Sequence, residues 1–356
     1  MNRSGGNYQL DFGSPAIDSG TNITGLTSDL AGNSRPQAVY GTGAMDMGCY
    51  EALPFTSGVL RCAFTVATNR GLNAHTTVFT AQVGGDPSVT NITNYTWDLG
   101  NGETPAGADR RVVTNATPYA PAAYDVTLTV DNGTTQPSFT RASAVQVVSN
   151  VAYAAIASAP QYPYNTWAKA ATNLQAAVDA AAVAADLGAA GPTVWVSNGA
   201  YNIAWQISIA RGVAVRSTAG PASAVIRRGS GNTRVASLTH ANALLDGFTL
   251  RDGELCSISP AGWGGGVYMT GGMLTNCVVR DCILHGGDNY IETRGNGVLM
   301  TGGLIVDCVV SNNSETLDQS YDIPMGGGIY ISGGTVRRSV ITKNRFNGPA
   351  AGSRQA

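Results

Sequence analysis

The apolar residues in the C-terminal third of the chain recur at a fixed spacing of 31 residues. Three segments, beginning at Gly264, Gly295 and Gly326, are copies of one another: GGGVYMTGGMLTNCVVRDC, GNGVLMTGGLIVDCVVSNN and GGGIYISGGTVRRSVITKN. Each copy alternates apolar and polar residues between glycines, which favours short strands over helices. A constant period in this range is typical of stacked units, so the pattern predicts a parallel β-solenoid. The positions expected to face its core are Val267, Met269, Leu274, Cys277 and Val279, then Val298, Met300, Ile305, Cys308 and Val310, and then Ile329, Ile331, Val336, Ser339 and Ile341.

One segment upstream of the repeat has the period of a helix. Thr172 and Gln175 form a capping-box pattern, and Gly188 suits the end of the helix. We therefore expect a helix over residues 172–187, which would cover backbone and side chains that the first rung of a solenoid exposes. Its apolar face would contain Leu174, Val178, Ala181 and Ala185. Strand-like runs begin at Thr193, Ile207 and Ala224, so the solenoid should start near residue 190.

Residues 58–148 have the strand and turn spacing of a β-sandwich. The strand-like runs are Val59–Ala67, Thr76–Val83, Tyr95–Leu99, Tyr124–Val130 and Ser143–Val148. Residues 1–52 are rich in loops, and residues 149–166, rich in Ala, Pro and Tyr, suit a linker. The predicted fold is therefore all-β, with a sandwich followed by a parallel β-helix over residues 167–356.

The composition excludes several classes of function. Only 12% of the 356 residues are charged and the net charge is −2, so no basic block indicates nucleic acid or anionic lipid as a partner. No apolar run reaches about 18 residues, so no membrane span is predicted. The first residues, MNRSGGNYQLDFGSP, lack the basic and apolar parts of a signal peptide.

The cysteines form no metal-binding pattern. All six are separated without a CxxC pair or a Cys/His cluster of the kind that binds zinc. Cys277 and Cys308 share one repeat position, which predicts a ladder of buried thiols rather than a disulfide. A bridge between Cys49 and Cys62 stays open at this point.

The middle of the chain resembles the PKD domain. The usual signature of that family is WDFGDG, and this chain has YTWDLGNGET from Tyr95, followed by the strand YDVTLTV. The resemblance implies an immunoglobulin-like sandwich, with Trp97 in its core and Gly100 and Gly102 in a tight turn. Asn101 replaces the second Asp of the signature, which argues against a cation site there.

Both flanks of this domain resemble parts of β-helix proteins. The phrases SPAIDSGTN, DLAGNSRPQ and AMDMGCYE in residues 1–52 are similar to the closing segment of bacterial right-handed parallel β-helices. The order NLQAAVDAA, TVWVSNGAY, ISIARGVAVRS and LLDGFTLRDG resembles the opening segment of the pectin-lyase-like β-helix, where a helix plugs the solenoid. The resemblances imply that the β-helix is right-handed, and that the chain is an excerpt of a longer bacterial tandem protein or an incomplete reading frame. We then expect an open last rung and self-association through its edge.

The repeat does not assemble the acidic groups that carbohydrate-cleaving enzymes of this fold need. Its polar stacks are Asn276, Asp307 and Arg338, and then Asp281, Asn312 and Lys343. The three histidines, His75, His240 and His285, are scattered. We therefore name no catalytic residue. The alternative is a polysaccharide lyase or glycoside hydrolase with the PKD domain as an accessory.

Two insertions and a row of aromatic residues supply the candidate ligand-binding residues. Residues 283–294 and 314–325 interrupt consecutive repeats at one corner, so they should stand side by side. They are either an acidic, tyrosine-bearing lobe that binds a glycan or calcium, or simply solvated loops. Alternation points Tyr268, Leu299 and Tyr330 outward on a flat β-face, with Trp263 just before them. The aromatic rings would either stack on sugar rings or serve simply as strand formers. The candidates are Trp263, Tyr268, Tyr330, Asp288, Tyr290, Glu292, Asp318, Tyr321 and Asp322.

Together the patterns predict a structural or adhesive module of an extracellular or cell-surface bacterial protein. The β-helices would act as rods and the PKD-like domain as a spacer. The expected partner is a polysaccharide or a cell-surface glycan. We expect no cofactor, and the sequence identifies no metal beyond the calcium that the acidic loops would take.

Overall fold

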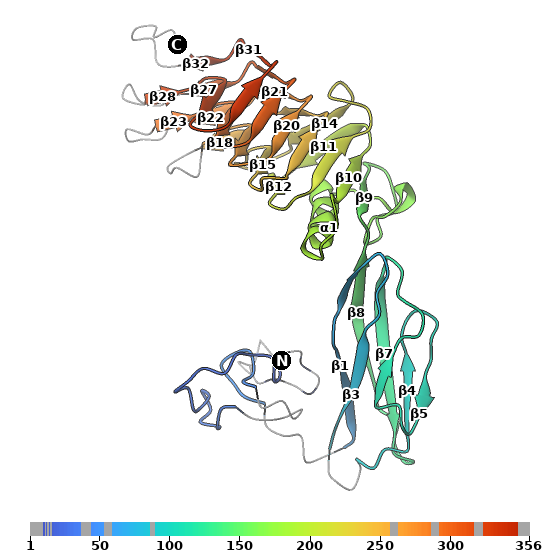
Figure 1. Ribbon diagram of the computed structural model, residues 1–356. Helices are drawn as coiled ribbons and strands as arrows, with labels where there is room; N and C mark the ends of the chain where they lie inside the picture. The colour runs from blue at the N-terminus through green and yellow to red at the C-terminus, as the bar shows by residue number, and fades with distance from the viewer. Residues whose placement is uncertain are drawn as a thin grey trace. The chain divides into compact units, whose positions relative to one another are not determined.

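A computed structural model describes residues 16–36, 44–52, 59–85, 90–256, 263–285, 292–316 and 323–347, with residues 10, 12 and 14 (Figure 1). The chain divides into two compact units, Met1–Val147 and Val148–Ala356. Each unit contains its own apolar core.

The described residues between positions 16 and 52 form loops held by side-chain hydrogen bonds. The Asp29 carboxylate accepts hydrogen bonds from the N–H groups of Ala31, Asn33 and Glu51. Burial by itself would raise the pKa of Asp29, but these bonds and one from the Asn33 side chain lower it to about 2. Arg35 Nε donates to the buried Glu51 carboxylate at 2.7 Å. That this segment closes a preceding β-helix stays a prediction.

The rest of the first unit is an antiparallel β-sandwich, as predicted. Its three-stranded sheet has the order β1 (Arg61–Val66), β3 (Val78–Gly84) and β6 (Val112–Thr114). Its five-stranded sheet has the order β2 (Arg70–Leu72), β8 (Ser138–Val148), β7 (Ala123–Asp131), β4 (Asn94–Asp98) and β5 (Ala106–Gly107).

Trp97 is the central side chain of the sandwich core, as the sequence indicates. It is fully buried, its ring centroid lies 5.5 Å from that of Phe64, and its Nε1 donates to the Arg110 carbonyl at 2.8 Å. Gly100 has a φ of +75°, and a Cβ there would collide with the carbonyl oxygen of Asp125. The predicted tight turn therefore requires glycine at this position.

The second unit is a right-handed parallel β-helix, in which strands of successive rungs pair in parallel. Sheet 1 contains β9 (Val151–Ala154), β10 (Thr193–Val196), β13 (Ala214–Ser217), β16 (Leu244–Asp246), β20 (Met273–Thr275), β25 (Leu304–Val306) and β30 (Thr335–Arg337). Sheet 2 contains β11 (Gly199–Ile203), β14 (Ala224–Arg228), β17 (Thr249–Arg251), β21 (Val278–Arg280), β26 (Val309–Ser311) and β31 (Val340–Thr342). Sheet 3 contains β12 (Ile207–Ile209), β15 (Ala236–Leu238), β19 (Val267–Met269), β24 (Val298–Met300) and β29 (Ile329–Ile331). Sheet 4 contains β18 (Glu254–Cys256), β22 (Ile283–His285), β27 (Ser314–Thr316) and β32 (Arg345–Asn347), and sheet 5 contains β23 (Glu292–Arg294) and β28 (Ile323–Met325).

The predicted register of the 31-residue repeat is confirmed. Val267 pairs with Val298, and Val298 pairs with Ile329. All the predicted inward residues of the first two copies are buried. In the third copy, Ile331 and Ile341 are 48% and 50% exposed, and self-association through this edge stays a prediction.

A helix covers the first rungs of the solenoid at the end opposite β31 and β32 (Figure 1). It is α1 (Leu174–Asp186), which follows a short 3-10 helix, η2 (Trp167–Lys169). The N-cap is Asn173 rather than Thr172, and the Asn173 side chain accepts a hydrogen bond from the Gln175 N–H at 2.9 Å. Gly188 has a φ of +85° just beyond the C-cap, as expected for the end of a helix.

Two predicted boundaries are wrong. The expected linker 149–166 contains β9, which pairs in parallel with β10 and so belongs to the first rung. The insertions expected at 283–294 and 314–325 begin and end as strands, because β22 pairs with β27 and β23 pairs with β28. These runs are too short to be recognised without their partners in the neighbouring rung.

The two polar stacks of the repeat are turn positions on the outside of the solenoid. Their six residues have φ values between +46° and +57°. Arg338 makes two hydrogen bonds to Asp307, at 2.7 and 2.8 Å, and holds the pKa of Asp307 below its usual value. Asp281 contacts Arg280 and accepts a hydrogen bond from Asn312 at 2.6 Å. These carboxylates are therefore engaged in links between turn residues.

Asn313 and Asn344, which directly follow the turn residues Asn312 and Lys343, form an asparagine ladder inside the solenoid. The fully buried Asn313 accepts a hydrogen bond from the Cys282 N–H at 3.0 Å and donates to the Val279 carbonyl at 3.2 Å. It also donates to the Asn344 side chain at 2.9 Å. The ladder therefore satisfies backbone groups that the turn leaves unpaired.

We expect Asn313→Ala to lower the free energy of unfolding of the β-helix by about 2–4 kcal/mol, because it leaves two buried backbone groups without partners. The matched control is Asn312→Gly, because the neighbouring Asn312 is exposed and its φ of +55° is one that glycine adopts without strain. Urea unfolding, with hydrogen exchange of residues 278–285, measures both. Equal losses in the two variants would contradict the role of burial.

Candidate functional site

The two tyrosines chosen from the sequence at the start and end of the repeat lie on the outer face of sheet 3, and Trp263 precedes its strand β19. Ser237, Tyr268, Leu299 and Tyr330 form one row in register. Tyr268 and Tyr330 are half-buried, and Leu299 is only 3% exposed. Leu299 therefore lies in the outward row, as expected, but it is covered, and its Cβ lies close to Gly264.

Two arginines stack on these rings. The guanidinium of Arg294 lies 4.2 Å from the ring centroid of Trp263 and 5.0 Å from that of Tyr330. The guanidinium of Arg234 lies 5.0 Å from the ring of Tyr268, and burial lowers the pKa of Arg234 from its usual value. Each ring thus has one face engaged in a cation–π contact. The sequence contained a signal for Arg294, because it follows Trp263 by one full repeat.

The acidic and tyrosine candidates in the insertions lie outside the described residues. They are Asp288, Tyr290, Asp318, Tyr321, Asp322 and the side chain of Glu292. The strands that flank the insertions pair between rungs, so the insertions leave neighbouring rungs at one corner. Within the described ranges, no group of three or more His, Cys, Asp or Glu residues is placed to hold a metal ion.

Asn101, which replaces an aspartate of the PKD signature, organises its own turn. Its Oδ1 accepts a hydrogen bond from the Glu103 N–H at 3.1 Å. Its Nδ2 donates to the Glu103 carboxylate at 3.2 Å and to the Thr117 carbonyl at 3.3 Å. This side chain therefore has a structural role.

The four buried cysteines of the described chain, Cys62, Cys277, Cys282 and Cys308, are unsuited to act as nucleophiles, because burial raises the pKa of each thiol. Cys49 and Cys62 are both free thiols, so the bridge left open by the sequence is not formed. Cys277 and Cys308 stack as a buried ladder, as predicted, and burial raises the pKa of Cys308 to about 11. A thiol with this pKa remains protonated at neutral pH.

The structure assembles one polar cluster that the sequence analysis did not identify. Glu254 contacts the guanidinium of Arg228 through one oxygen, and its other oxygen lies 3.0 Å from Nε2 of His285. The three side chains are 25–30% exposed. They come from β14, β18 and β22, so only the winding of the chain brings them together. The pairing of a histidine with a carboxylate is suited to acid–base chemistry.

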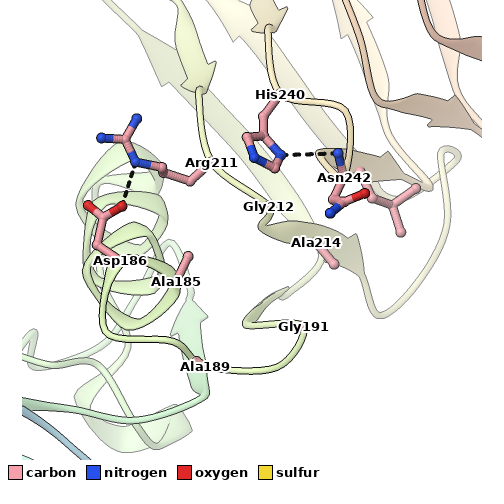
Figure 2. Close-up of a pocket in the computed structure, with 10 residues that line it drawn as sticks. Ala185, Asp186, Ala189, Gly191, Arg211, Gly212, Ala214, His240 and Asn242 are labelled. Atoms are coloured by element: carbon pink, nitrogen blue, oxygen red, sulfur yellow. Dashed lines mark hydrogen bonds and ion pairs between the residues drawn. The ribbon is translucent and has the colours of Figure 1, made fainter.

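A second feature is a cleft of about 520 Å³ beside the C-terminal end of α1 (Figure 2). Arg211 points toward Asp186 on one side of the cleft, and their ion pair measures 2.6 Å. His240 and Asn242 lie on the opposite side, where the Asn242 N–H donates to His240 Nδ1 at 3.1 Å. The lining residues come from α1 and from the turns before β13 and β16, so local sequence patterns contain no signal for the cleft.

Comparison with known proteins identifies one domain. Residues 63–138 match the PKD domain family. Neither the curated proteins nor the solved structures contain a match to the chain. PKD domains are typical of extracellular proteins. Among the described residues, no helix has the length and apolar character needed to cross a membrane.

Proposed function

We propose that this chain is a non-catalytic structural and adhesive module of an extracellular protein of a bacterial surface. The observation that supports the proposal most directly is the unbroken apolar core of the β-helix, in which like residues stack in register from β9 to β30. Such a stack resists bending because every rung is hydrogen-bonded to the next. The PKD domain is in keeping with an extracellular location.

The adhesive part of the proposal is the binding of a polysaccharide or a cell-surface glycan. Side chains suited to sugars project from the outer faces of the solenoid. They are Tyr268 and Tyr330 on sheet 3 and Trp263 just before β19, together with the arginines that stack on them. Aromatic rings bind the apolar faces of sugars, and guanidinium groups donate hydrogen bonds to sugar oxygens.

A second candidate function is cleavage of a polysaccharide, and the cluster of Arg228, Glu254 and His285 is the observation that favours it. It pairs an acid–base histidine with a carboxylate on an accessible face. Against it, Arg228 already neutralises Glu254, and a hydrolase needs a second carboxylate opposite the first. We therefore keep the non-catalytic proposal first.

We expect the full chain to be retained on at least one insoluble polysaccharide and to release neither unsaturated ends nor reducing sugar. The panel includes pectins and neutral polysaccharides, each with and without calcium. Turnover that is lost in His285→Ala and Glu254→Gln would establish the enzymatic alternative. The matched control is Asp307→Asn, because Asp307 is an exposed carboxylate paired with Arg338. Absence of retention on every polysaccharide would contradict the adhesive proposal.

A further inference from the structure

The outer face of sheet 1 presents a second row of aromatic residues at the first rungs of the solenoid. Tyr153 of β9 is in register with Trp195 of β10, which is in register with Arg216 of β13. The ring of Trp167 packs at 4.6 Å against Tyr153. Trp167 and Trp195 are 44% and 36% exposed, so their rings are more accessible than those on sheet 3.

A polar pair continues this row. Arg216 is in register with Asp246 of β16, and Arg216 Nη1 lies 2.6 Å from Asp246 Oδ2. Rungs are about 4.8 Å apart, so the row from Tyr153 to Asp246 spans about 14 Å. That length accommodates more than one sugar ring along the solenoid axis.

The row is continuous with the cleft of Figure 2. Ala214 and Leu244 precede Arg216 and Asp246 by two residues on the same strands, so they share the outer face of sheet 1. Both residues also line the cleft beside α1. Aromatic row and cleft therefore form one surface, which we call the sheet-1 surface.

The charges of the sheet-1 surface balance. Its two arginines, Arg211 and Arg216, are each paired at 2.6 Å with an aspartate, Asp186 and Asp246. An anionic ligand would face these aspartates and would have to displace them from the arginines. A paired guanidinium and carboxylate instead offer donors and acceptors side by side, which match the hydroxyl groups of an uncharged ligand.

We propose that the sheet-1 surface binds a neutral oligosaccharide. The apolar faces of its pyranose rings stack on Trp195 and on the packed pair of Trp167 and Tyr153, and its hydroxyl groups bond to the Arg216–Asp246 pair. The cleft beside α1 receives the next sugar unit, where the Asp186–Arg211 pair and His240 supply further hydrogen-bonding groups. This inference rests on the proposed adhesive function and assigns it a place and a ligand class.

The test is isothermal titration of the full chain with neutral oligosaccharides (cello-, xylo-, manno- and laminari-hexaose) and with a hexamer of galacturonate as the acidic probe. We expect at least one neutral hexamer to bind, and its affinity to be insensitive to salt. Trp195→Ala should weaken this binding at least tenfold, and Trp195→Phe should restore part of it because a ring is kept. The matched control is Trp205→Ala, which removes a tryptophan that is 83% exposed in the turn between β11 and β12.

Other outcomes separate this inference from the proposed function. Binding that survives Trp195→Ala but is lost in Trp263→Ala would overturn the inference and leave the adhesive function standing. If only the galacturonate hexamer binds, the inference of a neutral ligand is likewise overturned and the adhesive function still stands. If no hexamer and no polysaccharide binds, the adhesive function itself fails. Association of the wild type that Trp195→Ala abolishes in sedimentation, without any sugar binding, would identify the surface as a protein interface and refute the inference.

Discussion

Replacing Leu174 with aspartate is expected to lower the free energy of unfolding of the β-helix by about 4 kcal/mol. Leu174 is 2% exposed and belongs to the same apolar cluster as Val194 and Ile207 of the first rungs. The substitution removes a buried side chain and places a carboxylate where no partner is available. Hydrogen exchange of residues 193–217 in the full chain, measured across a urea series, reports the loss.

The same substitution at Leu187 is the matched control for Leu174→Asp. Leu187 is 38% exposed at the C-cap of α1, so Leu187→Asp should cost less than about 1 kcal/mol. The helix dipole alone predicts that Leu187→Asp lowers the free energy of unfolding more than Leu174→Asp, because an aspartate is favourable at the N-terminus of a helix and unfavourable at its C-terminus. A greater loss at Leu187 than at Leu174 would show that α1 does not protect the first rung by burial.

Replacing Trp97 with alanine is expected to cost the sandwich about 3–5 kcal/mol. The change removes the largest fully buried side chain of that core, its edge-to-face contact with Phe64 and its hydrogen bond to the Arg110 carbonyl. Hydrogen exchange of residues 61–148 should accelerate, whereas peptides from residues 267–311 should remain protected because they belong to a separate core.

The exposed Trp205 again serves as the reference for Trp97. Trp205→Ala deletes the same kind of side chain at a position of the β-helix that is 83% exposed. We therefore expect the free energy of unfolding of the β-helix to change by less than about 0.5 kcal/mol. If hydrogen exchange of residues 61–148 is no faster in Trp97→Ala than in the wild type, the core of the sandwich does not depend on the tryptophan of the PKD signature.

These expectations differ in how much of their basis is visible in the sequence. The position of Trp97 in the core is predicted by a local signature and confirmed by its burial. The stacking of Val267, Val298 and Ile329 is predicted by the period alone, since equal spacing places equal residues over one another. The existence of α1 is predicted by its apolar face and its terminal glycine, whereas its N-cap is displaced by one residue.

Contacts between different rungs are much harder to predict. The segment VAYA becomes β9 only because β10 offers a parallel partner, and nothing within those four residues distinguishes a strand from a linker. Leu299 alternates outward as expected but is buried, since exposure depends on what covers the face rather than on strand period.

The candidate surfaces, too, combine residues that the sequence predicts with contacts that only the structure reveals. The sequence identified Tyr268 and Tyr330 as outward aromatic residues near Trp263. Its period places Arg294 one repeat after Trp263, but it did not indicate that Arg234 stacks on Tyr268. Tyr153, Trp195 and Arg216 lie in one row although they are far apart in the chain.

The sequence by itself determined the repeat, its register and the identity of the sandwich, because these depend on periodicity and on short local motifs. The tertiary structure alone decided the first rung, the burial and backbone partners of the asparagine ladder, the cluster around Glu254 and the cleft beside α1. Each of these depends on the winding of the chain, which places residues from separate strands about 4.8 Å apart across neighbouring rungs. Local spacing constrains which face a residue occupies, and only the completed stack decides which side chain lies next to it.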